Sequence, residues 1–164
     1  DSSSIMNGLD ISAYHNLSDD LIGSVKFYVR SIHGLEDDDV RLTSRLYIPQ
    51  NRLRGFNTRK VGPKDGEDYI GGNYVTALGF EAQLPNLLPE STRTDVSLFL
   101  DSANIWHIDY SDTLDDTNKI RASVGVAANM WTTIGPVSFT LAQDLTKSIN
   151  DETESFNFRI GTSF

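Results

Sequence analysis

Alternation of apolar and polar side chains with a period of two constrains the fold of this chain more than any other feature. The repeat is clear at seven places: 21–30, 41–48, 74–84, 95–101, 120–130, 137–144 and 156–164. A weaker repeat near Ile11, Ala13 and His15 predicts one more strand. No convincing amphipathic helix is visible. The sequence therefore predicts an all-β protein of about eight antiparallel strands.

The two faces of each predicted strand differ in composition. Leu98 and Leu100, for example, alternate with Ser97 and Asp101, and Ser, Thr, Gly, Arg and Asp recur on the second face throughout. In a soluble sandwich the apolar face points into a core. In a transmembrane barrel the apolar face meets lipid and the polar face lines a lumen. The alternation alone is compatible with both folds.

Charge and composition exclude several classes of protein. Fourteen Lys and Arg stand against 23 Asp and Glu, for a formal net charge of -9, so nucleic acid is not an expected partner. The absence of cysteine removes disulfides and thiolate metal sites. No apolar run approaches the roughly 18 residues of a membrane-spanning helix.

The connections between the predicted strands favour the barrel. Ile134-Gly135-Pro136 is a tight turn, whereas 51–72, 107–119 and 146–155 are long and polar. Short turns at one rim and long loops at the other are typical of outer-membrane barrels, as are aromatic residues at the rims. Trp106 and Trp131 lie at such predicted strand ends.

Several motifs occur in the order of a known family. Leu53-Arg54-Gly55-Phe56, followed by Gly62-Pro63 and Gly71-Gly72-Asn73, resembles the sixth-loop signature of the bacterial outer-membrane assembly and two-partner-secretion (surface antigen) superfamily. Later motifs match its following strands: Phe80-Glu81 with Pro85, Leu100-Asp101 to Trp106, Ile134 to Val137, and Phe158 to Phe164. The loop glycines favour its barrel assembly factors, the BamA family. TamA-like and two-partner secretion barrels stay open as alternatives.

The resemblance implies a 16-stranded transmembrane barrel, of which residues 1–164 form about the last eight strands, with a long inward-folding loop at 51–72. It implies insertion and folding of β-barrel proteins in the bacterial outer membrane by the central subunit of the barrel assembly machinery. The implied partners are nascent barrel proteins, other machinery subunits bound mostly through missing periplasmic domains, and outer-membrane lipid and lipopolysaccharide. A small self-contained barrel (porin or anchor) and a soluble β-sandwich are the rivals.

Arg54 is the first candidate site residue. Glu81 and Asp101 fall on the polar faces of the next two predicted strands, so an inward-folded loop would bring the guanidinium against both carboxylates. The planar fork of arginine suits such a contact, and the family resemblance implies the same one. Gly55 would allow a tight bend, and Phe56 would pack below it. We expect these residues to latch the loop.

The C-terminal strand is the second candidate site. Phe156, Phe158, Ile160 and Phe164 share one face, with Gly161 opposite, and resemble the targeting signal that assembly machinery reads in its substrates. The resemblance also implies that this last strand pairs weakly with the first strand of the barrel. Such an under-paired edge can template an incoming strand.

The remaining polar clusters predict no catalytic chemistry. His15, His33 and His107 have neither metal-ligand spacing nor a nearby serine elbow. The acidic runs at 36–39, 109–116 and 151–154 lack the spacing of a calcium loop, and we interpret them as solvated turns. We therefore expect no enzyme activity, no metal and no cofactor.

Overall fold

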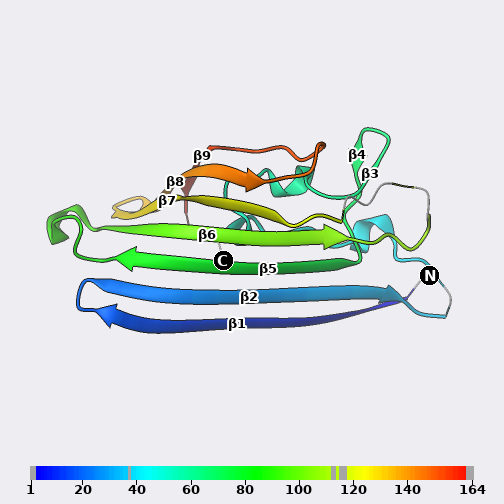
Figure 1. The fold of residues 1–164 in the computed structure, drawn as a ribbon, viewed down its shortest axis with the longest axis horizontal. Helices are drawn as coiled ribbons and strands as arrows, with labels where there is room; N and C mark the ends of the chain where they lie inside the picture. The colour runs from blue at the N-terminus through cyan, green and yellow to red at the C-terminus, as the bar shows by residue number, and fades with distance from the viewer. Residues whose placement is uncertain (1–2, 37, 112–113, 115–117, 162–164) are drawn as a thin grey trace.

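The computed structural model describes residues 3–36, 38–111, 114 and 118–161. Within them, seven strands form one antiparallel sheet in the order β1-β2-β5-β6-β7-β8-β9 (Figure 1). The strands are β1 (Ser4–Ser18), β2 (Leu21–Gly34), β5 (Tyr74–Leu84), β6 (Thr94–Trp106), β7 (Arg121–Thr132), β8 (Gly135–Thr146) and β9 (Phe156–Ile160). Apart from the jump between β2 and β5, each strand pairs with its neighbour in sequence. The predicted antiparallel all-β fold is confirmed.

The long connection between β2 and β5 contains the other elements near the sheet. These are the short 3₁₀ helices η1 (Leu42–Ser44), η2 (Gln50–Arg52) and η3 (Thr58–Lys60), and the two-stranded hairpin β3 (Lys64–Asp65) and β4 (Asp68–Tyr69). A fourth 3₁₀ helix, η4 (Glu90–Thr92), lies in the turn between β5 and β6. No helix in the described part of the chain is long and apolar enough to cross a membrane.

The prediction of a strand at 41–48 is wrong. This segment contains η1 and a single antiparallel bridge between Leu46 and Gly72. Within it the adjacent residues Arg45 and Leu46 are both buried, because Arg45 hydrogen-bonds to Asn73 while Leu46 joins the hydrophobic core. A strand whose one face is solvated would bury only every second residue. The opposite error affects β1, which is far longer than its weak alternation indicated.

The two faces of the sheet carry opposite residue types. We call the inner face the one that bears Ser97, Asp101 and Ser123, which are 3%, 1% and 0% exposed. On the outer face Leu98, Val124 and Phe158 are 50%, 42% and 46% exposed. A soluble sandwich would bury the apolar set and solvate the polar set. The observed arrangement is instead that of a transmembrane barrel wall.

The hydrophobic core lies between the inner face and the connection 35–73, which Figure 1 shows beside the sheet in cyan and teal. Leu53, Phe56 and Val61 from this connection are fully buried, as are Val75 of β5 and Ile105 of β6. The connection thus covers one end of the inner face and brings its own apolar residues to the contact.

The connections sort into two rims. β1–β2, β5–β6 and β7–β8 are joined by short turns at one end of the sheet. The connections from β2 to β5, from β6 to β7 and from β8 to β9 leave the strands at the other end. Trp106 stacks on Tyr74 at the long-loop rim, with ring centroids 5.6 Å apart. Trp131 lies close to the short-turn rim. Aromatic residues at both rims are typical of membrane barrels.

Candidate functional site

The loop 51–72 brings Arg54 onto the inner face of β5 and β6. The guanidinium donates from Nε and Nη2 to Asp101, at 2.7 and 2.9 Å, and from Nη1 to Glu81 at 2.6 Å. The backbone N–H of Arg54 also donates to Asp101, at 3.0 Å. The two carboxylates are 2% and 9% exposed, so these charge-assisted bonds lie largely out of water, where they are strongest.

An aromatic ring supports the same guanidinium. Arg54 Cζ lies 3.8 Å from the centroid of Phe99, which projects from the inner face of β6 between Glu81 on β5 and Gly125 on β7. Stacking on an aromatic face suits arginine better than lysine, because the guanidinium is planar and weakly hydrated. The Ser123 hydroxyl donates to the carbonyl of Arg54. Three consecutive strands therefore hold this one residue.

Gly55 takes a backbone conformation with φ of +89°, which side-chain-bearing residues rarely adopt. A Cβ at this position would also lie 2.7 Å from the Cβ of Ala142 on β8 and 3.4 Å from that of Ser123. The glycine is needed both for the bend and for the close approach of the loop to the sheet. Phe56 follows it and is fully buried in the hydrophobic core.

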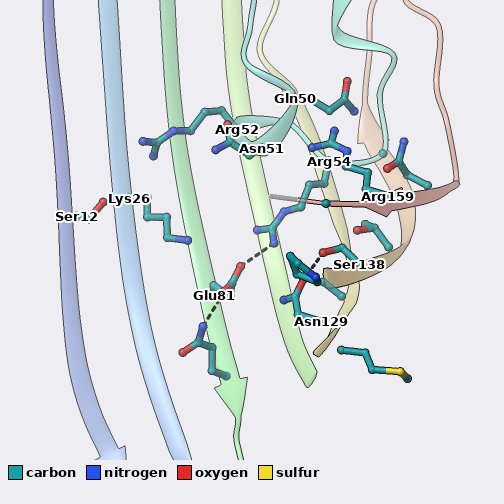
Figure 2. A pocket seen from close by; sticks show the side chains of 18 of the residues that line it. Ser12, Lys26, Gln50, Asn51, Arg52, Arg54, Glu81, Asn129, Ser138 and Arg159 are labelled. Carbon is teal, nitrogen blue, oxygen red and sulfur yellow. Dashed lines mark hydrogen bonds and ion pairs between the residues drawn. The ribbon is translucent and has the colours of Figure 1, made fainter. Parts of the chain in front are cut away.

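A cavity of about 580 Å³ opens on the inner face, beside Arg54, Gly55 and Glu81 (Figure 2). Four cationic side chains line it, Lys26, Arg52, Arg54 and Arg159, together with a single carboxylate, Glu81. Arg52 is paired with Asp10 of β1 at 2.7 Å. The cavity is thus a polar, basic space in an acidic chain.

Two further arginine–carboxylate contacts anchor the long loops, and the sequence interpretation missed both. Arg45 pairs with Asp109 and donates to Asn73 Oδ1 at 2.6 Å and to the carbonyl of Val40 at 3.1 Å. Arg121 on β7 pairs with Asp151 at 2.8 Å, and both side chains are fully buried. The interpretation of the acidic runs as solvated turns is therefore wrong for Asp109 and Asp151. Spacing could not find these pairs, because the partners are 64 and 30 residues apart.

Asp109 illustrates the electrostatics of these loops. Burial by itself would raise the pKa of this carboxyl group, but hydrogen bonds from the N–H of Val40 and from Asn73 and Arg45 outweigh it, so the pKa lies below its ordinary value. Asp109 is therefore ionised at neutral pH and accepts bonds from three parts of the loop region. Among the described residues, no group of three His, Cys, Asp or Glu side chains is arranged to hold a metal ion.

The C-terminal residues named from the sequence lie on β9 and just beyond it. Phe156, Phe158 and Ile160 are exposed on the outer face, and Phe158 packs against Phe139 of β8 with ring centroids 5.0 Å apart. Gly161 has φ of +103° and donates to the carbonyl of Pro136 at 2.8 Å. Phe164 lies outside the described residues. β9 pairs with β8 over only five residues.

The sheet with its exposed apolar outer face, together with a loop fixed on its polar inner face, defines a segment of a transmembrane β-barrel. The model of the Omp85 superfamily domain matches residues 1–164, and the chain belongs to that superfamily.

Two curated relatives are outer membrane protein assembly factors BamA. The one from Neisseria meningitidis serogroup B is 28% identical over 68% of this chain and 17% of its own length. The one from Neorickettsia risticii is 26% identical over 82% of this chain and 18% of its own length. The chain thus spans less than a fifth of either relative.

A solved structure has the same fold. The crystal structure of BamA from Haemophilus ducreyi lacking POTRA domains 1-3 superposes with a TM-score of 0.83 at 25% identity, over 94% of this chain and 34% of that one. The predicted resemblance to the C-terminal barrel region of BamA is confirmed.

Proposed function

We propose that this chain is part of an integral outer-membrane barrel that inserts and folds other β-barrel proteins, as the central subunit of a barrel assembly machinery. The observation that carries the proposal is the contact of Arg54 with Asp101 and Glu81 in a chain of the Omp85 superfamily whose curated relatives are named assembly factors. No bond chemistry, metal or cofactor enters this function.

The latch residues would act by position. Arg54, Gly55 and Phe56 hold the loop against Glu81 and Asp101, which keeps the inner face in one arrangement while the barrel edges rearrange. The exposed apolar residues of β9 and Phe164 would serve as the targeting signal and as the seam strand. An edge strand with few partners can pair with an incoming strand through its free backbone groups.

The partners follow from the same proposal. They are nascent outer-membrane barrel proteins, the other subunits of the machinery, and outer-membrane lipid and lipopolysaccharide. The exposed apolar outer face fits lipid contact, because its side chains have no cover within the described residues. The net charge of -9 argues against nucleic acid.

A reconstitution assay tests the function directly. Full-length protein in liposomes should accelerate the folding of a urea-denatured outer-membrane barrel, followed by its heat-modifiable migration in a gel. Liposomes that hold an equal amount of an unrelated porin are the control. Folding no faster than in the porin liposomes would overturn the proposed function.

The same assay then tests the latch. Arg54→Ala should slow substrate folding, while Arg59→Ala should leave it unchanged, because Arg59 is an exposed arginine of the same loop. Arg54→Lys should lie between them, since lysine keeps the charge and loses the planar fork. Equal rates for Arg54→Ala and Arg59→Ala would contradict the latch role while leaving the assembly function standing.

A further inference from the structure

Part of the connection between β8 and β9 runs antiparallel to the loop 51–72, which we call the latch loop. Gly55 accepts a hydrogen bond from the N–H of Glu154 at 2.9 Å, and Asn57 donates to the carbonyl of Glu152 at 3.0 Å. Phe56 and Thr153 form an antiparallel bridge between these two bonds. Glu152 also donates to the carbonyl of Lys60 at 3.0 Å. We call the paired segments 55–60 and 152–154 the clip.

The clip limits the length of the last strand. β9 pairs with β8 from Val137 to Leu141, and one more bond joins Ala142 to Ser155 at 2.8 Å. β8 itself continues to Thr146, but residues 152–154 turn away from it and take the loop as their partner. The same backbone groups cannot pair with both. Residues 152–154 can therefore either pair with the loop or lengthen the pairing of β9 with β8, but not both.

A buried ion pair closes the clip at its far end. Arg121 of β7 donates from Nε and Nη2 to Asp151 at 2.8 and 3.2 Å, and both side chains are fully buried. Asp151 also accepts from the N–H of Ser148 at 2.7 Å and from that of Gly62 at 3.3 Å. This one carboxylate thus joins the sheet, the β8–β9 connection and the latch loop.

We propose that Arg121 and Asp151 are positioning residues that couple the latch loop to β9, so that the two move as one unit. The inference rests on the proposed function only for its consequence, which is control of the seam strand by the loop. A buried ion pair contributes little net stability compared with apolar packing. However, it favours one geometry of its two side chains, and removing one partner is costly because the other charge stays buried and uncompensated. That combination suits a coupling contact.

Hydrogen exchange in the full-length protein tests the coupling without any substrate. Asp151→Asn keeps the shape of the side chain and removes its charge. Amides of the clip and of β9 should then exchange about tenfold faster or more, while those of β5 and β6 stay as in the wild type. Asp144→Asn is the matched control, since the Asp144 carboxylate on β8 lies 3.6 Å from the half-exposed Lys147 and accepts from its neighbour Gln143 at 3.2 Å, with no contact to the clip in the described residues. A uniform rise over all strands, or a rise confined to the clip with β9 unchanged, would overturn the proposal.

A disulfide provides the rescue. The chain has no cysteine, and Asn57 and Glu152 lie opposite each other in the clip. Asn57→Cys with Glu152→Cys, oxidised in the Asp151→Asn background, should restore protection of β9, and reduction should remove it. Protection that does not return on oxidation would show that clip and strand are independent, against the proposal.

Folding failure is also decisive. If Asp151→Asn does not insert, Asp151→Glu and Arg121→Lys keep the charges and should loosen the clip and β9 more mildly. If these variants also fail to insert, the pair is needed by the whole barrel and the coupling role is wrong. Exchange that follows the proposal in a protein that does not accelerate barrel folding would leave the coupling standing and overturn the proposed function.

Discussion

The two faces of the sheet invert the usual rule that apolar side chains lie inside and polar ones outside. On the outer face Leu100 of β6 is exposed, whereas Asp101 next to it on the inner face is buried. At the long-loop end the inner face is polar and yet shielded, because the connection between β2 and β5 folds onto it and supplies Arg54 as a counter-ion. The outer face has no such cover within the described residues.

The difference shows that the two faces are stabilised by different kinds of interaction. The inner face is held by a few directed, charge-assisted bonds, so single substitutions there should be costly and specific. The outer face needs only apolar surface, so its tolerance should depend on polarity and depth rather than on shape. Substitutions on each face test this contrast.

The largest effect is expected at Arg54. Arg54→Ala leaves Asp101 and Glu81 without their counter-ion, and removing one partner of a buried pair costs about 3–5 kcal/mol. Protease should then cut the loop between Asn57 and Tyr69 in intact cells. Adding Glu81→Gln should recover part of the protection, because one stranded charge is relieved. Full protection in Arg54→Ala would show that the inner face does not hold the loop through this residue.

The next effect is expected on the outer face. Leu100 lies near the middle of β6, and Arg at the bilayer midplane of a barrel costs about 2–4 kcal/mol. Leu100→Arg should lower the urea midpoint of the folded barrel in lipid vesicles. Ile160→Arg is the control near the short-turn rim and should cost about 0–1 kcal/mol. Equal costs at the two depths would refute lipid contact of the outer face.

Gly55→Ala should have an intermediate effect on the inner face. The left-handed conformation costs a side-chain-bearing residue about 1–2 kcal/mol, and the overlap with Ala142 adds to that cost. Gly66→Ala separates the two terms, because Gly66 also has a positive φ of +61° but a Cβ there would meet nothing within 4 Å. Unfolding in urea should rank Gly55→Ala as the less stable variant. The reverse order would argue against a close approach of loop and sheet.

The smallest effect concerns pH and Asp109. Its pKa is lowered in the folded protein, so its contribution to stability is fully present above the ordinary value of 3.8 and is lost as pH falls below that value toward the folded pKa. Hydrogen exchange at Val40, whose N–H donates to Asp109 at 2.8 Å, should quicken in that range beyond the intrinsic pH effect. Asp109→Asn should abolish this excess dependence, and its persistence in that variant would assign it to another group.

Prediction from the sequence succeeded where the structure is local. Period-two alternation located β2, β5, β6, β7, β8 and β9, because successive side chains of a strand point to opposite faces of the sheet. It failed at 41–48, where Arg45 and Leu46 are both buried by different partners. The sequence also singled out Arg54, Glu81 and Asp101, which lie together in the structure. It could not find Asp151, because an acidic turn residue looks the same whether solvated or paired.

By itself, then, the sequence determined the strands, their two unlike faces and the loop motif, since backbone geometry ties side-chain direction to position in a strand. It left open which face is covered, because alternation is the same in a sandwich and in a barrel. Only the tertiary structure decided that the polar face is the one onto which the long connection folds, and that Asp109 and Asp151 pair with Arg45 and Arg121. Those contacts join residues distant in sequence, and their strength comes from removal from water, which exists only once the loops have folded onto the sheet.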